Sequence, residues 1–344
     1  MKKASVFFKN KIVVTCFVMT GIALVLCACG ISRTYVSNFR DDIACSDYNL
    51  ELEDVSIEIE GIKGSYNFLF MTDNQANFDD RYDLGWFGNS EIRCYRDSTG
   101  ISSADNLTNW IQYANDSQVD AFLMGGDVID FCSEKNTSVL QEYLIQLKIP
   151  YIYTYGNHDS YIPWEHRFDD QNTMFLSFFK EDNCEFQVMD IGELYIVSIR
   201  NYQVDGLAQI SKEALDGLKD VMDDGKPIVL ICHVPICTEE TASLKQMAQA
   251  HQGDLVVKYD AGEFGIVDKS VLLGEECGYE LTDETRQFLE LLTSPESSVI
   301  MVLSGHLHES WQGYINENIY QYVGNGAFTN KGAVIHMTGK NTRE

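Results

Sequence analysis

Basic residues are scarce in this chain of 344 residues. It carries 25 Lys and Arg against 52 Asp and Glu, which gives a formal net charge of −27. Binding to nucleic acid rests on Lys and Arg that neutralise phosphates, so we expect no nucleic-acid partner. A small phosphorylated molecule stays compatible with this charge, because bound divalent cations reverse the local sign.

Internal repeats and low-complexity tracts are also missing from the sequence. Hydrophobic residues make up 45% of the chain and aromatic residues 12%, a globular composition that excludes general disorder. The length allows one large domain or two ordinary ones, each with a full core. We expect a single domain.

No two of the ten cysteines are spaced as Cys-x-x-Cys, so a zinc ribbon is unsupported. A Ser or Cys nucleophile in a recognisable catalytic frame is missing as well. Cys232 lies inside an apolar run next to His233. Two interpretations of Cys232 are open: a buried thiol, which we favour, and a metal or redox role.

The first 29 residues are expected to be a targeting segment outside the fold. Lys residues at positions 2, 3, 9 and 11 form a basic start, and residues 12–28 form an apolar run. The sequence around Cys29 is similar to a bacterial lipobox. Three outcomes are open: a lipoprotein anchored at Cys29, which we favour, an uncleaved membrane anchor, and plain secretion. Each places the body of the protein outside the cytoplasm, with residues 30–54 as a tether and 55–340 as the folded domain.

Polar side chains follow five apolar, β-rich runs at the points where these runs end. The runs cover residues 66–71, 119–124, 151–155, 227–232 and 299–303. The segments after them are Asp73-Asn74-Gln75, Gly126-Asp127, Gly156-Asn157-His158-Asp159, His233 and Gly305-His306-Leu307-His308. Such runs are typical of buried strands, and ligands bind outside the carboxyl ends of strands in open α/β sheets. Carboxylate, imidazole and amide groups gathered there indicate a metal site.

The order D-x-Q, GD, GNHD, a lone His after a strand, and GHxH resembles the calcineurin-like metallophosphoesterase superfamily, from about Tyr66 to about Phe328. One residue departs from the family pattern, which has D-x-H where this chain has Gln75. The resemblance implies an α/β layered sandwich of two mixed β-sheets flanked by helices. It also implies two divalent metal ions, with Mn, Fe, Zn and Mg as the candidates.

The resemblance further implies a role for each polar residue. Asp73, Gln75, Asp127 and His308 would hold one metal, and Asp127, Asn157, His233 and His306 would hold the other, with Asp127 as the bridge. His158 would face the leaving group as a general acid or a cation, and Asp159 would orient it. The nucleophile would be a metal-bound hydroxide that attacks phosphorus directly.

The segments between the runs contain four predicted helices and two stretches whose role the sequence leaves open. Apolar residues recur at helical spacing in residues 107–114, 139–147, 214–222 and 282–292. In the irregular stretch 76–103, Arg81 and Arg93 are either phosphate ligands or solvated surface, and Trp86 and Phe87 are either a substrate lid or surface. The segment 237–278 is either an insertion over the site or a solvated excursion.

The main functional expectation is an extracytoplasmic phosphoesterase that acts on small phosphate monoesters or diesters. We expect a monomer held at the membrane by its N-terminal segment or a lipid. One alternative is a catalytically inactive metal-binding receptor or scaffold on the same fold, and another is a different metal hydrolase. Because the amide of Gln75 is a weaker donor than imidazole, we expect one metal to bind less tightly and to be Mn or Mg rather than Zn.

Overall fold

The computed structural model describes residues 35–79, 95–160, 185–202, 208–255, 272–274 and 280–340. The segment 1–29 with Cys29 lies outside the described residues, as do Arg81, Trp86, Phe87 and Arg93. The predictions made for them therefore stay predictions. Within the described part, no helix is both long enough and apolar enough to span a membrane.

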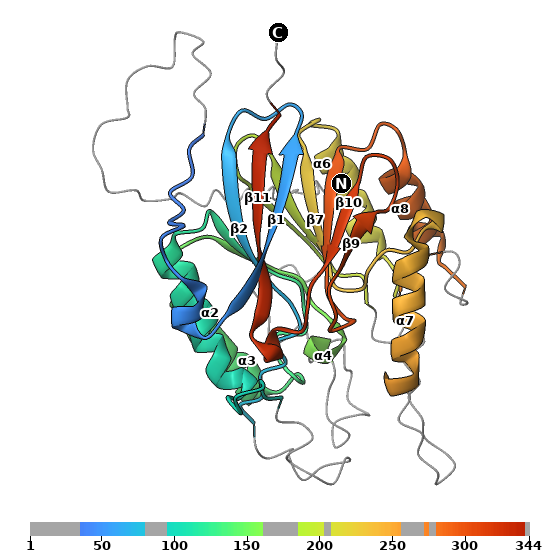
Figure 1. Ribbon diagram of the computed structural model, residues 1–344. Coiled ribbons are helices and arrows are strands. Elements are labelled where there is room, and N and C mark those ends of the chain that lie inside the picture. The colour runs from blue at the N-terminus through green and yellow to red at the C-terminus, as the bar shows by residue number, and fades with distance from the viewer. Residues whose placement is uncertain are drawn as a thin grey trace, which may run out of the picture. The chain divides into compact units, whose positions relative to one another are not determined.

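The strands form two mixed sheets (Figure 1). The first sheet has five strands in the order β1 (Glu51–Ile59), β11 (Lys331–Gly339), β2 (Ser65–Met71), β3 (Ala121–Met124) and β4 (Tyr151–Tyr153). Only the β11–β2 pair in it is antiparallel. The second sheet has six strands in the order β5 (Phe186–Asp190), β6 (Tyr195–Ile199), β7 (Ile228–Cys232), β8 (Val299–Ser304), β10 (Tyr320–Val323) and β9 (Trp311–Tyr314). Its central strands are parallel and its two outer pairs antiparallel.

The two sheets pack face to face through a shared apolar core. Phe68 and Phe70 of β2 and Ile231 of β7 belong to one buried cluster between the sheets. Leu69 and Met71 point to the opposite face of β2 and belong to a second cluster. This alternation follows from the two-residue period of a strand, and an apolar run buried on both faces is its sequence signature.

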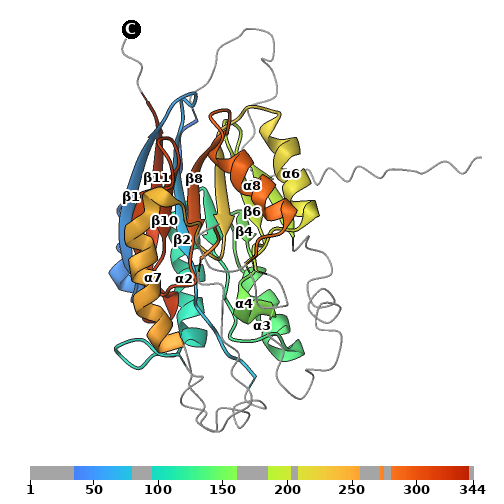
Figure 2. The ribbon, with the colours of Figure 1, turned by 90° about the vertical axis from the view of Figure 1, so that its right-hand side faces the viewer.

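Helices cover the outer faces of both sheets (Figure 2). On the first sheet lie α2 (Ser103–Ser117) and α3 (Glu134–Leu144), and on the second lie α6 (Lys212–Met222) and α8 (Asp283–Thr293). Each of these helices begins after a Ser or Thr whose hydroxyl accepts a backbone N–H of the first turn: Ser102, Ser133, Ser211 and Thr282. The predicted layered sandwich of two mixed sheets flanked by helices is therefore confirmed.

The N-terminal boundary of the domain differs from the prediction. The first strand begins at Glu51 rather than Val55, and the residues before it include the short 3₁₀ helix η1 (Cys45–Tyr48). Phe39, Ile43 and Tyr48 pack against the core under α2. The tether expected for residues 30–54 is thus wrong for residues 35–54, because their apolar side chains are partly buried on the domain.

Cys232, at the end of β7, has the environment of a buried thiol. Its side chain is 1% exposed, and its Sγ lies 3.5 Å from Ser304 Oγ. Burial raises the pKa of the thiol to about 12, so the reactive thiolate is strongly disfavoured. The buried-thiol interpretation is confirmed.

Candidate metal centre

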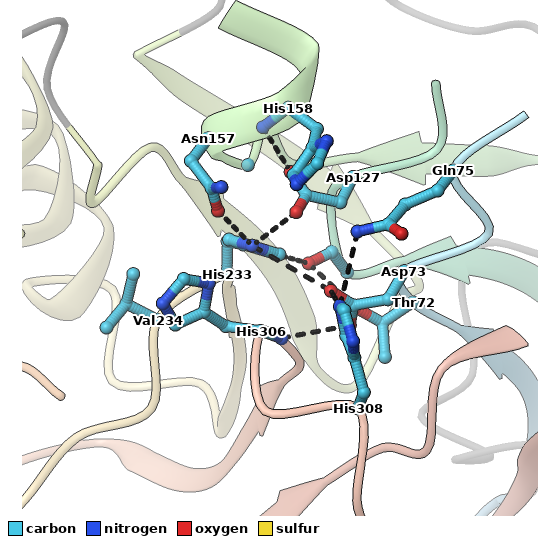
Figure 3. A network of polar contacts seen from close by, with 12 residues as sticks. Thr72, Asp73, Gln75, Asp127, Asn157, His158, His233, Val234, His306 and His308 are labelled. Atoms are coloured by element: carbon cyan, nitrogen blue, oxygen red, sulfur yellow. Dashed lines mark hydrogen bonds and ion pairs between the residues drawn. The ribbon is translucent and has the colours of Figure 1, made fainter. Parts of the chain in front are cut away.

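The polar segments that follow the five strands meet at one edge of the sandwich (Figure 3). Asp73 and Gln75 follow β2, Asp127 follows β3, and Asn157 and His158 begin the short helix α4 (Asn157–Ser160) after β4. The second sheet contributes His233 after β7, and His306 and His308 after β8. Parallel strands end at the same edge of a sheet, so the two sheets present these side chains together.

The backbone at this edge adopts an unfavourable conformation. Eight non-glycine residues of the described part have positive φ, and five of these are predicted metal ligands. They are Asp73 (φ 54°), Gln75 (49°), Asp127 (52°), His306 (71°) and His308 (57°). Left-handed backbone costs about 1–3 kcal/mol for each such residue and persists where the surroundings hold it, typically at functional sites. The local conformation therefore marks the same residues that the sequence motifs single out.

Two glycines make this close approach possible. A Cβ on Gly126, which has φ of 95°, would meet His233 Nδ1 at 2.7 Å. A Cβ on Gly305 would collide with the Thr72 hydroxyl and the Asp73 carboxylate. The glycines of the GD and GHxH motifs are thus required by space around the site.

His233 is oriented as a metal ligand by its backbone contact. Its ring is fully buried, and Nδ1 lies 2.9 Å from the carbonyl oxygen of Gly125. Since a carbonyl only accepts, Nδ1 carries the proton and Nε2 is directed at the site. Nε2 lies 3.1 Å from Asn157 Oδ1 and 3.2 Å from Asp127 Oδ2 (Figure 3). The ligand atoms of Asp127, His233 and His306 all lie within 4.8 Å of one another, close enough to share one ion.

The other predicted ligand set is also assembled. His308 Nε2 lies 3.4 Å from Asp73 Oδ1 and 3.2 Å from Gln75 Nε2. Asp73 Oδ1 and Gln75 Oε1 are buried oxygens without a hydrogen-bond partner. Buried polar atoms are normally hydrogen-bonded, so these two oxygens fit a bound cation. The His308 side chain is 29% exposed, whereas Asp73 and Gln75 beside it are fully buried.

Asp73 and Asp127 lie between the two sets. Asp73 Oδ1 is 4.0 Å from His233 Nε2 as well as 3.4 Å from His308 Nε2. Burial opposes ionisation of Asp127, but the adjacent His233 and His158 outweigh it and hold the pKa of Asp127 well below its usual range. The carboxylate form that a metal requires is therefore the stable form.

His158 is oriented by Asp130, and Asp159 has another role. His158 Nδ1 lies 2.8 Å from the carbonyl oxygen of Asp130 and 3.2 Å from its Oδ1. The Asp159 carboxylate instead accepts the backbone N–H groups of Asp127 at 2.7 Å and Gly156 at 2.9 Å, with two more from the residues after Asp127. The prediction that Asp159 orients His158 is wrong, because this carboxylate holds the backbone of the GD loop.

The charge of His158 follows from its neighbours. Burial opposes the charged form, but Asp127 and Asp130 outweigh it and raise the pKa of His158 to about 10. Its side chain is 29% exposed. The imidazolium is therefore both stable and accessible at the surface of the site.

The family model of calcineurin-like phosphoesterases matches residues 66–310. The chain belongs to this family.

Several solved structures are similar to it at low sequence identity. A dimetal phosphatase from Danio rerio shares 13% identity, with 77% of this chain and 88% of that chain covered and a TM-score of 0.46. A purple acid phosphatase from yellow lupin (Lupinus luteus) shares 13% identity, with 83% and 48% covered and a TM-score of 0.43. A phosphopantetheinyl hydrolase from Mycobacterium tuberculosis shares 10% identity, with 77% and 91% covered and a TM-score of 0.38. No curated protein shows significant sequence similarity to the chain.

Two residues of this calcineurin-like site were not predicted from the sequence. Asp130, the partner of His158, stands three residues after Asp127. Thr72 donates its hydroxyl to Asp73 Oδ2 at 2.7 Å and so fixes that carboxylate. The spacing of Asp130 from the GD motif was a usable signal, whereas nothing in the sequence distinguishes Thr72 from an ordinary strand residue.

Proposed function

We propose that the chain is a metal-dependent phosphoesterase that hydrolyses small phosphate monoesters or diesters. The observation that carries this proposal is the convergence of the seven predicted ligands on one edge, where the ligand atoms of Asp127, His233 and His306 lie within 4.8 Å of one another and His308 Nε2 lies 3.4 Å from Asp73 Oδ1. Membership of the calcineurin-like phosphoesterase family supports it. The ionised state of Asp127 and the tautomer of His233 fit a divalent cation.

The two ligand sets would each hold one divalent ion. In the first set are Asp73, Gln75, Asp127 and His308, and in the second are Asp127, Asn157, His233 and His306. When bound, such ions supply a nucleophile at neutral pH and offset the charge of the phosphoryl oxygens. Aspartate, histidine and amide donors suit Mn, Fe, Zn and similar ions.

His158 would supply the proton for the leaving group. Asp130 holds its Nδ1, so Nε2 is the ring nitrogen that can face a substrate. The stable imidazolium either donates this proton to the departing oxygen or stabilises the developing negative charge. General acid catalysis of this kind contributes about 10²–10⁴-fold to the rate.

The proposed reaction can be tested with chromogenic substrates. The purified full-length chain in detergent would be assayed on p-nitrophenyl phosphate and bis-p-nitrophenyl phosphate, with and without added Mn²⁺. We expect turnover of at least one ester that needs the metal and is lost in both Asp127→Ala and His158→Ala. Metal binding without turnover of either ester would contradict the proposal and favour an inactive scaffold.

We further propose that the enzyme body works outside the cytoplasm as a monomer, attached through its N-terminal segment. The basic start, the apolar run of residues 12–28 and the sequence around Cys29 support this location. Metabolic labelling with palmitate in a bacterial host would test the lipid. We expect label in the wild type and none in Cys29→Ala, and an unlabelled wild type would exclude the lipoprotein.

A further inference from the structure

The GHxH loop, residues Gly305–His308, carries one ligand from each set on a short and unfavourable backbone. His306 and His308 both have positive φ, and the N–H of the intervening Leu307 donates to the carbonyl of Gly305 at 2.8 Å. The first half of the loop is held by polar contacts. Gly305 N–H donates to the carbonyl of His233 at 2.9 Å, and His306 N–H donates to Asp73 Oδ2 at 2.9 Å.

The second half of the loop is held by an apolar contact. Leu307 is 2% exposed and belongs to a small buried cluster separate from the three larger cores. This cluster also contains Val323 at the end of β10, and Trp311 at the start of β9 packs against it. A buried leucine between two histidine ligands therefore anchors the loop that presents both.

The rest of this cluster comes from the segment 237–278, whose role the sequence left open. The helix α7 (Ala242–Leu255) contributes Leu244 and Ala248, which are 0% and 2% exposed and share a helix face because they are four residues apart. The Ser243 hydroxyl of α7 accepts the indole N–H of Trp311 at 3.0 Å. Figure 1 shows α7 on the same side of the molecule as β9 and β10.

A second contact fixes the same segment to the residues that follow His233. Leu272 and Leu273 lie beside Pro235–Cys237, with the N–H of Cys237 donating to the carbonyl of Leu273 at 2.7 Å. Leu272 enters the same cluster as Leu307. The described parts of 237–278 are thus packed on the domain. This contradicts the interpretation of the segment as a solvated excursion.

We propose that α7 is the positioning element for both metal sets: through the cluster around Leu307 it holds His306 and His308 in place. This inference rests on the metal centre of the proposed function. It predicts that a substitution in α7, which supplies no ligand, weakens both metal-binding steps together. Residues outside the first coordination shell commonly change metal affinity about 10–100-fold when altered.

The test compares two leucine variants of the full-length protein, freed of metal and titrated with Mn²⁺ in a calorimeter. Leu244→Ala removes the helix contact to the cluster. Leu292→Ala is the matched control, because Leu292 is also 0% exposed on a helix but belongs to another buried cluster, which contains neither Leu307 nor a predicted ligand. We expect Leu244→Ala to raise both dissociation constants at least about tenfold and Leu292→Ala to raise neither.

Equal dissociation constants in the two variants, or an effect on one step alone, would overturn the proposal. If Leu244→Ala does not fold, Met247→Ala removes a partly buried neighbour of the same cluster and should act in the same direction with smaller size. Leu244→Met, which conserves volume, should restore wild-type affinity. The titration needs no turnover, so a failure of the proposed ester hydrolysis would be seen separately in the chromogenic assay.

Discussion

Gln75 is the residue that sets this chain apart from the D-x-H pattern. Its amide nitrogen lies 3.2 Å from His308 Nε2, and its Oε1 is buried without a hydrogen-bond partner. A neutral amide oxygen is a harder and weaker donor than imidazole. The first metal should therefore exchange more readily than the second.

Gln75→His should tighten the first metal site and shift its preference from Mn²⁺ towards Zn²⁺. The measurement is metal content by mass spectrometry after dialysis against mixed Mn²⁺ and Zn²⁺. The wild type should retain about one ion and the variant about two. Unchanged content and unchanged preference in the variant would refute a labile first site.

Asp130 and Asp159 make a matched pair for the chemistry of His158. Asp130→Asn removes a charge that raises the pKa of His158, so that pKa should fall. Because the protonated imidazole is the active form, the alkaline limb of kcat should move to lower pH, and kcat on that limb should fall by up to about 10²-fold with metal content unchanged. Asp159→Asn should leave this limb in place and instead lower metal content, since it loosens the GD loop. An alkaline limb at the same pH in the wild type and in Asp130→Asn would show that this carboxylate does not set the charge of His158.

These two residues also show what the sequence could and could not predict about the site. The ligands were predictable because each follows a strand, and strand ends converge by topology. The partner of His158 was not, because Asp159 is adjacent to it in sequence but points elsewhere. In the α4 turn, consecutive side chains diverge by about 100°. Neighbours in sequence on a helix do not face each other.

Among the elements, β11 is the strand whose place in the sheet could not be predicted from the sequence. It is nine residues long and lies between β1 and β2 in the first sheet. Its pairing joins residues about 270 positions apart, such as Phe68 and Ile335. Local pattern predicts that a strand exists, whereas its partners depend on the packing of the whole chain.

Three segments distant in sequence are joined by one carboxylate. Asp97 accepts hydrogen bonds from Thr99 and Ile101 before α2, from Asn49 after η1, and from Asn330 between the 3₁₀ helix η6 (Ala327–Thr329) and β11. Burial opposes its ionisation, but these hydrogen bonds outweigh it and hold the pKa of Asp97 well below its usual range. The charged form is therefore stabilised by folding.

Asp97→Asn should lower the free energy of unfolding at pH 7 by about 1–3 kcal/mol, because an amide cannot accept all of these bonds. A carboxyl whose pKa is depressed in the folded state stabilises above its unfolded pKa of about 3.9 and loses this contribution as the pH falls below it. Urea unfolding of the wild type and the variant should thus differ at pH 7 and differ less at pH 3. The exposed Asp47→Asn is the control and should stay within about 0.5 kcal/mol of wild type. A deficit of equal size at both pH values would show that the charge of Asp97 is not its source.

In the molecule as a whole, each ligand set combines residues from both sheets. Asp73, Gln75, Asp127 and Asn157 follow strands of the first sheet, whereas His233, His306 and His308 follow strands of the second. An ion in either set would therefore connect the two halves of the sandwich at the edge where the shared core ends. Metal occupancy should then contribute to the stability of the whole domain and not only to the reaction.

Chelation should consequently lower the unfolding temperature of the wild-type protein. A ligand that binds only the folded state stabilises it by about 2.7 kcal/mol when its free concentration is about 100 times its dissociation constant. Scanning calorimetry with excess Mn²⁺ and then with EDTA should show this difference as a lower transition in EDTA. Asp127→Ala removes the ligand common to both sets, so its transition should be the same in the two solutions. A wild-type transition indifferent to EDTA would mean that the ions do not hold the sheets together, even if they remain necessary for turnover.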